Sequence, residues 1–427
     1  MNYQYKPFSP EKMKKVRDAF YWVDADPESG ERIFFENSGG SFRLKSAVER
    51  KSHYEELPDC PERTHERALE LIAVQKKAES DITDVICHAK GGVIDCALTA
   101  SQLNFKLAEV VAENIPGKNI VTSVLEHPSS FDAAKYCADK MGMELRVAQA
   151  NPVTGGIDVE EVVRHIDKDT CFLSVMYASN ISGAVMDIEA IVREARKIKP
   201  DLFVICDAVQ HVMHGVIDVE KMGVDALIFA PYKFFCTRGA GYAWISDRMA
   251  ALRHHKLAGK NANVWELGSP TPSNFAALTA VVDYVCDLGQ DAVSSENRRD
   301  RFVAGMNQIR EHETALYERL LVGSDSQKGL RDIPGVNVYF DDGDLSTKDV
   351  IIGMSIDNAD CAEAVAEYAK EHVTVYERVS SSLYSVRMLK ALGIDGCIRV
   401  SPLHCNNFEE IDRFLAITEK IAKKFNK

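Results

Sequence analysis

Short apolar runs alternate with amphipathic stretches through the middle of the chain. The apolar runs are bounded by turn-forming residues, as expected for strands that are buried on both faces of a sheet. We predict such strands at residues 119–123, 144–148, 171–177, 202–206 and 225–230. We predict helices between them at residues 129–141, 159–166 and 188–198. Because strand and helix alternate, we expect an α/β fold with a mostly parallel sheet and right-handed crossovers.

The pattern changes after about residue 290, where the elements become typical of a smaller α+β domain. We predict helices at 294–322, 361–371 and 408–424, with strands near 336–339, 351–355 and 398–400. Further elements are expected upstream: a short helix from Pro10, a strand at 32–36 and helices at about 61–88 and 273–287. We therefore divide the chain into an N-terminal arm (1–30), a large domain (31–290) and a small C-terminal domain (291–427).

The composition is that of an ordinary soluble globular protein, with 46% hydrophobic and 27% charged residues among 427. A formal charge of −13 argues against a nucleic acid or an anionic membrane as the main partner. No signal-peptide region and no apolar run long enough to span a bilayer are present. The 11 cysteines are scattered without a CxxC pair or a metal-ligand spacing. We expect a cytoplasmic protein with reduced cysteines and no metal site.

Two of the predicted strands lead into side chains that suit catalysis or ligand binding. The first ends at Asp207, and the second leads into Lys233. Open α/β sheets bind their ligands at the carboxyl ends of parallel strands. A carboxylate and an amine at this edge suit pyridoxal 5′-phosphate (PLP), which needs a lysine Schiff base and an acid partner for its pyridinium nitrogen. The same two residues, taken alone, are also explained as a strand-capping aspartate and a surface lysine.

Two neighbouring signals are weak when taken singly. Thr99, followed three residues later by Gln102, has the pattern of a capping box, so a helix should begin here. The first N–H groups of such a helix form a natural phosphate site, although helix capping without a ligand also explains Thr99 and Gln102. His127 lies in a loop after a predicted strand, where a single histidine is more often a surface residue than a catalytic one.

These pieces, in this order, resemble the class V aminotransferase group of fold-type I PLP enzymes. That group includes cysteine desulfurases, selenocysteine lyases, kynureninase and isopenicillin N epimerase. The resemblance covers roughly residues 30–290, with a weaker echo near the C-terminus. It implies a large PLP-binding domain of fold-type I, a smaller C-terminal α+β domain, and an enzyme that acts on a small amino acid.

The resemblance also implies roles at the reacting centre. Lys233 would form the Schiff base and later move the α-proton. His127 would stack on the ring of PLP and assist proton transfer. Asp207 would hold the pyridinium nitrogen protonated, while Gln210 and Asn180 would lie near the phenolic oxygen O3′.

Other residues would hold the phosphate and the substrate. The capping segment Thr99, Ala100 and Ser101 takes the phosphate position. Tyr232 stands where many members have a histidine before the lysine. Ser269 would reach the phosphate of a partner subunit, which implies a homodimer. Arg399 would bind the α-carboxylate, because a guanidinium fork holds a carboxylate bidentately, and Asn37 would line the substrate pocket.

The chain also departs from the family pattern. Ala230 replaces the serine of the family's Ser-x-His-Lys motif. Cysteine desulfurases carry a nucleophilic cysteine shortly before the carboxylate-binding arginine, but the matching segment here, residues 376–384, has none. Cys405 is a nearby alternative. Since desulfuration needs a thiolate, we favour a lyase that works by β-elimination. An aminotransferase or epimerase remains open, as does a non-catalytic binding protein of the same fold.

Overall fold

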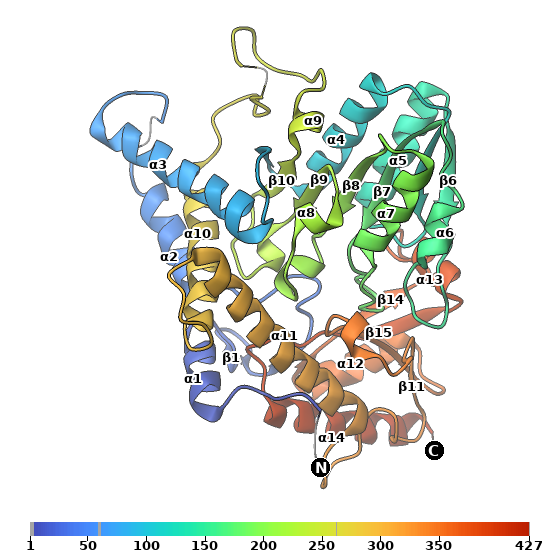
Figure 1. The fold of residues 1–427 in the computed structure, drawn as a ribbon. Helices are drawn as coiled ribbons and strands as arrows, with labels where there is room; N and C mark the ends of the chain where they lie inside the picture. Colours follow the sequence, from blue (N-terminus) through green and yellow to red (C-terminus); the bar gives the residue numbers. More distant parts are fainter. Residues whose placement is uncertain (1–3, 59–60, 262, 427) are drawn as a thin grey trace.

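The computed structural model describes residues 4–58, 61–261 and 263–426. Its centre is a seven-stranded sheet with the strand order β4-β10-β9-β8-β7-β5-β6 (Figure 1). The strands are β4 (Val93–Ala97), β5 (Asn119–Ser123), β6 (Glu144–Ala148), β7 (Thr170–Met176), β8 (Phe203–Asp207), β9 (Ala226–Phe229) and β10 (Gly241–Ile245). The run from β9 to β6 is parallel, and β10 pairs antiparallel with both β9 and β4. The predicted mostly parallel sheet is confirmed.

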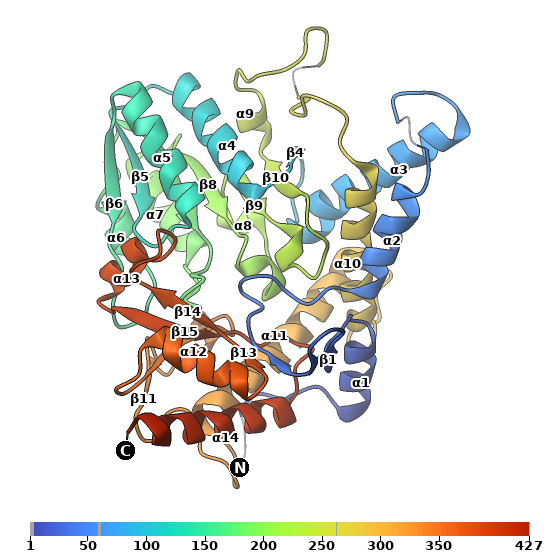
Figure 2. The same ribbon diagram turned by 180° about the vertical axis from the view of Figure 1, so that it is seen from behind.

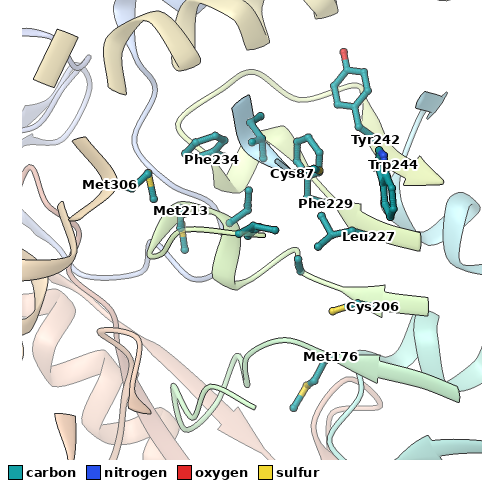
Figure 3. Packing of buried hydrophobic residues seen from close by; sticks show 14 of the residues in the cluster. Cys87, Met176, Cys206, Met213, Leu227, Phe229, Phe234, Tyr242, Trp244 and Met306 are labelled. Carbon is teal, nitrogen blue, oxygen red and sulfur yellow. The ribbon is translucent and has the colours of Figure 1, made fainter. Parts of the chain in front are cut away.

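Helices cover both faces of this sheet. They are α4 (Ala100–Asn114), α5 (Pro128–Met141), α6 (Val159–Val163), α7 (Ile188–Ile198) and α8 (Val219–Met222). Along β8, Ile205 packs in a cluster with α4 and α5, whereas Val204 and Cys206 pack in a second cluster with α6 and α7. Figure 3 shows this second cluster, in which Phe229 and Met306 also lie. Burial on alternating faces explains why β8 is apolar up to Asp207.

Long helices flank the sheet and lead to the second lobe. They are α2 (Lys45–Glu55), α3 (Glu66–Ser80), α10 (Pro272–Gly289) and α11 (Arg298–Val322), with the short α9 (Asp247–Ala250) before α10. The predicted helix at 61–88 begins later, at Glu66, and its last turns form a π-helix at Asp81–Ile86. Residues 59 and 60 lie outside the described residues.

The C-terminal lobe contains a four-stranded antiparallel sheet with the order β11-β12-β15-β14. Its elements are β11 (Val336–Val338), β12 (Ile352–Ile356), α12 (Cys361–Lys370), β14 (Tyr376–Val379), α13 (Val386–Leu392), β15 (Gly396–Val400) and α14 (Phe408–Phe425). Figures 1 and 2 show this lobe, in orange and red, at one end of the large sheet. The α+β prediction is confirmed, although β14 and α13 were not predicted.

The N-terminal segments pack against both lobes. Helix α1 (Pro10–Asp18) begins as predicted, with Ser9 as the N-cap that accepts a hydrogen bond from the Lys12 N–H at 3.2 Å. After the short hairpin of β1 (Ala25–Asp26) and β2 (Gly30–Glu31), strand β3 (Ile33–Phe34) pairs in parallel with β13 (Val373–Thr374). Ile33 therefore contributes to the core of the C-terminal lobe. The domain boundaries given above stay a prediction.

Within the part of the chain that the structure describes, no helix is both long and apolar enough to cross a membrane. Among the same residues, no group of three or more histidine, cysteine, aspartate or glutamate side chains is placed to hold a metal ion.

Candidate active site

A cavity of about 380 Å³ lies at the carboxyl ends of β7, β8 and β9. Most of the predicted site residues line this cavity: Thr99, Ala100, Ser101, His127, Asn180, Asp207, Gln210, Tyr232 and Lys233. These residues come from separate loops that the parallel sheet brings to one edge, as the strand–helix alternation requires. Asn37, Ser269 and Arg399 do not line it.

Lys233 is a buried amine that has no acidic partner in contact among the residues that the structure describes. It ends a short 3₁₀ turn, Pro231–Lys233, which follows β9, and its side chain is 7% exposed. Its Nζ donates to Gln210 Oε1 at 3.0 Å. Burial, followed by the nearby charge of Arg399, lowers the pKa of Lys233 to about 7, against the opposing effect of Asp207. Much of the amine is therefore neutral near pH 7, as a nucleophile or a general base requires.

Asp207, the last residue of β8, is held in a fixed orientation at the cavity. Its Oδ2 accepts from Ser130 Oγ at 2.7 Å and from Asn104 Nδ2 at 3.2 Å. Its Oδ1 accepts from the Val209 N–H at 3.0 Å. Sequence reasoning missed Ser130 and Asn104. A polar residue on the buried face of α4 is the signal that could have revealed Asn104, because buried polar side chains are normally hydrogen-bonded.

Gln210 has one satisfied and one unsatisfied end. Its Oε1 accepts from Lys233, while its buried Nε2 has no partner among the described residues. A buried donor without a partner costs about 1–3 kcal/mol, so this N–H fits a ligand oxygen in the cavity, such as the phenolic oxygen of PLP. Asn180 lines the same cavity.

The N-terminus of α4 forms one end of the cavity, with the backbone of Gly241 close beside it. Thr99 is the N-cap of α4, and its Oγ1 accepts from the Gln102 N–H at 3.2 Å, so the predicted helix start is confirmed. Gly241 approaches closely, since a Cβ at that position would lie 2.4 Å from the Ala100 nitrogen. A helix N-terminus beside a small-residue loop suits a phosphate group. Sequence reasoning missed Arg238, which lines the cavity and stacks on Tyr232 at 4.2 Å.

His127 lies at the start of α5, facing the cavity. Its Nδ1 accepts from the Ser129 N–H at 3.2 Å, which fixes the ring as the N-cap of that helix. Burial among neighbouring groups lowers the pKa of His127, although Asp207 opposes the change. The ring is therefore mostly neutral near pH 7, which suits a side chain that stacks on an aromatic cofactor.

The loop that carries His127 is clamped by the C-terminal lobe. Arg387 in α13 donates to the carbonyls of Val124 and Glu126, the second at 2.7 Å. Its guanidinium also lies over the Phe131 ring at 3.9 Å. Glu126 is itself fully buried, and desolvation raises its pKa to about 8. Sequence reasoning missed Arg387, because nothing in the sequence pattern indicated α13.

The residues predicted to bind substrate lie behind the cavity wall. Arg399 in β15 is 2% exposed, and its Nη1 donates to the carbonyl of Asn180, a lining residue, at 2.9 Å. Asn37 is fully buried, and its side chain bonds to the Ser401 carbonyl at 3.1 Å and to the Phe42 N–H at 3.1 Å. Asn37 thus fixes a turn instead of pointing into the cavity. Its substrate-binding role and that of Arg399 stay predictions.

Ser269 lies away from the cavity. It is exposed, in the segment between α9 and α10, and Figure 1 shows this segment extending from the body of the molecule. Its contact with the phosphate of a partner subunit stays a prediction.

The segment at residues 376–384, where the family resemblance led us to look for a cysteine, is exposed at its C-terminal end. Leu383 is 88% exposed and Tyr384 is 62% exposed. Just before them, Arg378 is buried and donates to the Tyr384 carbonyl at 2.7 Å. Burial, helped by Arg399, lowers the pKa of Arg378 to about 10.

None of the cysteines that the structure describes lines the cavity. Cys405, the alternative nucleophile, is fully buried. Desolvation raises its thiol pKa well above the usual value, whereas a nucleophilic thiol needs a lowered pKa. Cys60 lies outside the described residues.

Comparisons with known proteins show what the chain is similar to. The family model described as Aminotransferase class-V matches residues 33–414. A probable cysteine desulfurase from Borreliella burgdorferi is 23% identical over 97% of this chain and 98% of its own length. A probable cysteine desulfurase from Pseudomonas putida is 25% identical over 70% of this chain and 70% of its own length.

Solved structures share the fold. The apo structure of a cysteine desulfurase from Thermococcus onnurineus NA1 matches with a TM-score of 0.80 at 20% identity, over 99% of this chain and 100% of that one. The cysteine desulfurase CsdA from Escherichia coli matches with a TM-score of 0.78 at 16% identity, over 98% of this chain and 100% of that one. These likenesses confirm the predicted fold class.

Proposed function

The chain belongs to the class V aminotransferase family, whose members are PLP-dependent enzymes, and we propose that it is a PLP-dependent lyase. Its substrate is a small amino acid with a leaving group on the β-carbon. Where that leaving group is sulfur, it departs without the help of a protein thiolate. The reaction is then a β-elimination, of which C–S cleavage is one case.

The cavity residues fit PLP. When bound, PLP supplies an electron sink for the bond that is broken at the α-carbon. The three donors around Asp207 hold its carboxylate ready for a protonated ring nitrogen. The free N–H of Gln210 fits the phenolic oxygen, and the start of α4 at Thr99, Ala100 and Ser101 fits the phosphate.

Proton transfer falls to Lys233. Because burial lowers its pKa to about 7, the amine can accept the α-proton at neutral pH and release it again. His127 bounds the cavity as a mostly neutral ring, which favours stacking over donation of a proton. Arg387 keeps the His127 loop in place from the C-terminal lobe.

The observation that supports elimination is the position of the cysteines that the structure describes. No described cysteine lines the cavity, and residues 376–384 contain none. With no thiolate to take the sulfur, the C–S bond electrons leave with the sulfur itself as a thiolate or sulfide. From cysteine and water, the balanced products are pyruvate, ammonia and hydrogen sulfide.

The test is product analysis with purified, PLP-loaded protein and L-cysteine. We expect pyruvate, ammonia and sulfide in equal amounts, without added reductant. Alanine, with the sulfur retained on the protein, would contradict the proposal and favour a persulfide route. Turnover that depends on an added keto acid would favour an aminotransferase. Lys233→Ala should abolish product formation, whereas Lys135→Ala, at an exposed position, should not.

Cys60 is the one cysteine whose position relative to the cavity the structure does not describe. Cys60 lies outside the described residues, so Cys60→Ser should be assayed in parallel. Elimination without a protein thiol predicts unchanged product ratios. A loss of turnover in this variant would identify Cys60 as the sulfur acceptor and refute the thiol-free reaction.

We also infer that the protein is a homodimer. The inference is supported by the exposed position of Ser269 and by the exposed Leu257 and Leu267 in the same segment, since exposed apolar side chains grouped together often mark an interface. Leu98, which lines the cavity and is 70% exposed, is another apolar side chain that a partner subunit would cover. Sedimentation velocity at micromolar concentration should show a dimer, and a monomer would contradict the inference. A cytoplasmic location stays a prediction.

A further inference from the structure

Arg399 already holds a carboxylate of its own chain. Its Nη2 forms an ion pair with Glu36 Oε1, and its Nη1 donates to the Asn180 carbonyl at 2.9 Å. The side chain of Arg399 is 3% exposed, and that of Glu36 is 16% exposed. The guanidinium proposed to receive the substrate carboxylate is therefore neutralised before any substrate arrives.

The backbone holds this pair in place. Glu36 forms a parallel bridge with Ser401, two residues beyond Arg399 on the same strand edge, and the Asn37 N–H donates to the Ser401 carbonyl at 3.2 Å. Gly39 makes room for the pair, because a Cβ there would lie 2.2 Å from Glu36 Oε1 and 3.4 Å from Arg399 Nη2. The contact is thus built into the turn and is not an incidental surface ion pair.

Both partners are incompletely satisfied. Arg399 Nε and Glu36 Oε2 are buried and have no hydrogen-bond partner among the described residues. A buried ion pair is stable only when its remaining donors and acceptors are also satisfied. The Nε–H without a partner leaves the guanidinium able to donate to an oxygen of a second carboxylate.

The pair also lies close enough to the reacting centre to act on it. Arg399 and Glu36 have opposite effects on the pKa of Lys233, with Arg399 lowering it and Glu36 raising it. Arg399 also touches the wall of the cavity, because its Nη1 donates to the carbonyl of Asn180, a lining residue, so a substrate carboxylate that enters beside Asn180 meets this guanidinium. Two carboxylates at one guanidinium repel each other, so one must give way.

We propose that Glu36 is a specificity-determining residue that competes with the substrate carboxylate for Arg399. This inference rests on the proposed function, because it assumes an amino-acid substrate at Lys233. The α-carboxylate binds by displacing Glu36 from Arg399. The free energy needed to break the Arg399–Glu36 ion pair therefore weakens the net binding of the substrate carboxylate. The native protein then prefers amino acids over the corresponding amines only weakly, and removing the Glu36 charge strengthens that preference.

The test compares two ligands that differ only in the carboxylate. PLP-loaded protein is titrated with L-alanine, which carries no β-leaving group, and with ethylamine, which lacks the carboxylate. The change in cofactor absorption gives each dissociation constant. In Glu36→Gln we expect L-alanine to bind about tenfold tighter, a change of about 1.4 kcal/mol. Ethylamine should bind within about twofold of its affinity for the native protein.

The control is Glu31→Gln. Glu31 pairs with Arg413 at 2.8 Å, and both side chains are largely exposed, so this variant makes the same change in net charge away from the site. It should leave both ligands unaffected. If Glu36→Gln folds poorly, Glu36→Asp tests the same contact, because the shorter carboxylate reaches Arg399 less well. It should also tighten L-alanine binding, by a smaller factor.

Three outcomes would overturn the proposal. Unchanged or weaker binding of L-alanine in Glu36→Gln would show that Glu36 is not a competitor. An equal gain for L-alanine and ethylamine would show an effect that does not involve the carboxylate. In either case a normal cofactor spectrum would leave the proposed function standing. A protein that binds no PLP at all would instead refute the proposed function and this inference together.

Discussion

The lowered pKa of Lys233 gives the most specific prediction. Burial and the charge of Arg399 bring it from 10.5 to about 7. At pH 7 about half of the amine is then neutral, compared with roughly one part in three thousand for an ordinary lysine. Replacing Arg399 by methionine removes a cation and leaves the Glu36 carboxylate unpaired. Both changes favour the ammonium form, so the pKa of Lys233 should rise by about one pH unit.

Competitive acetylation of the cofactor-free protein measures this pKa directly. Acetic anhydride reacts with neutral amines, and mass spectrometry reports the modified fraction of the peptide that carries Lys233, with exposed Lys135 as the internal standard. The native midpoint should lie near pH 7, and Arg399→Met should move it upward. Arg331→Met, in a surface pair with Asp341, should not move it. A native midpoint near pH 10, or a downward shift in Arg399→Met, would refute the reasoning.

Three further predictions follow from individual contacts. Arg387→Met should destabilise the loop at residues 124–131 by about 2 kcal/mol, seen as faster hydrogen exchange there, whereas Lys390→Met on the exposed side of the same helix should have no effect. Burial alone would lower the pKa of His214, but its buried partner Glu313, whose Oε2 lies 2.7 Å from His214 Nδ1, raises that pKa overall. The stability that this pair contributes is thus complete below about pH 6.5 and is lost as the pH rises through the raised value, so His214→Gln should flatten the dependence of Tm on pH in that window. Ala230→Ser, which restores a hydroxyl at the cavity, should tighten PLP several-fold in absorption titrations, and unchanged affinity would contradict that placement.

The central strands of the large sheet were predictable because β5, β7, β8 and β9 are buried on both faces. Residues 119–123 and 144–148 form strands with the predicted bounds. Strand β14 was missed because it is short and mostly not buried, so it carries no continuous apolar run. Helix α13 has only seven residues and no capping hydrogen bond from a side chain. Short elements of this kind are set by tertiary contacts more than by their own sequence.

The same distinction applies to the site. Asp207 and Lys233 were predictable because each follows a recognisable buried strand. Arg387 and Glu36 were not, since each acts on residues more than 250 positions away in the sequence. No local pattern indicates which strand end such a side chain will meet. The contacts of Arg387 and Glu36 are therefore visible only in the folded structure.

The central claim is that Lys233 holds PLP in this cavity. The most direct measurement is an absorption spectrum of PLP-supplemented protein before and after borohydride reduction, followed by mass mapping of the reduced peptide. The account predicts a visible cofactor band that reduction removes, with a pyridoxyl group on Lys233. Absence of the band, or an adduct on another lysine only, would contradict it.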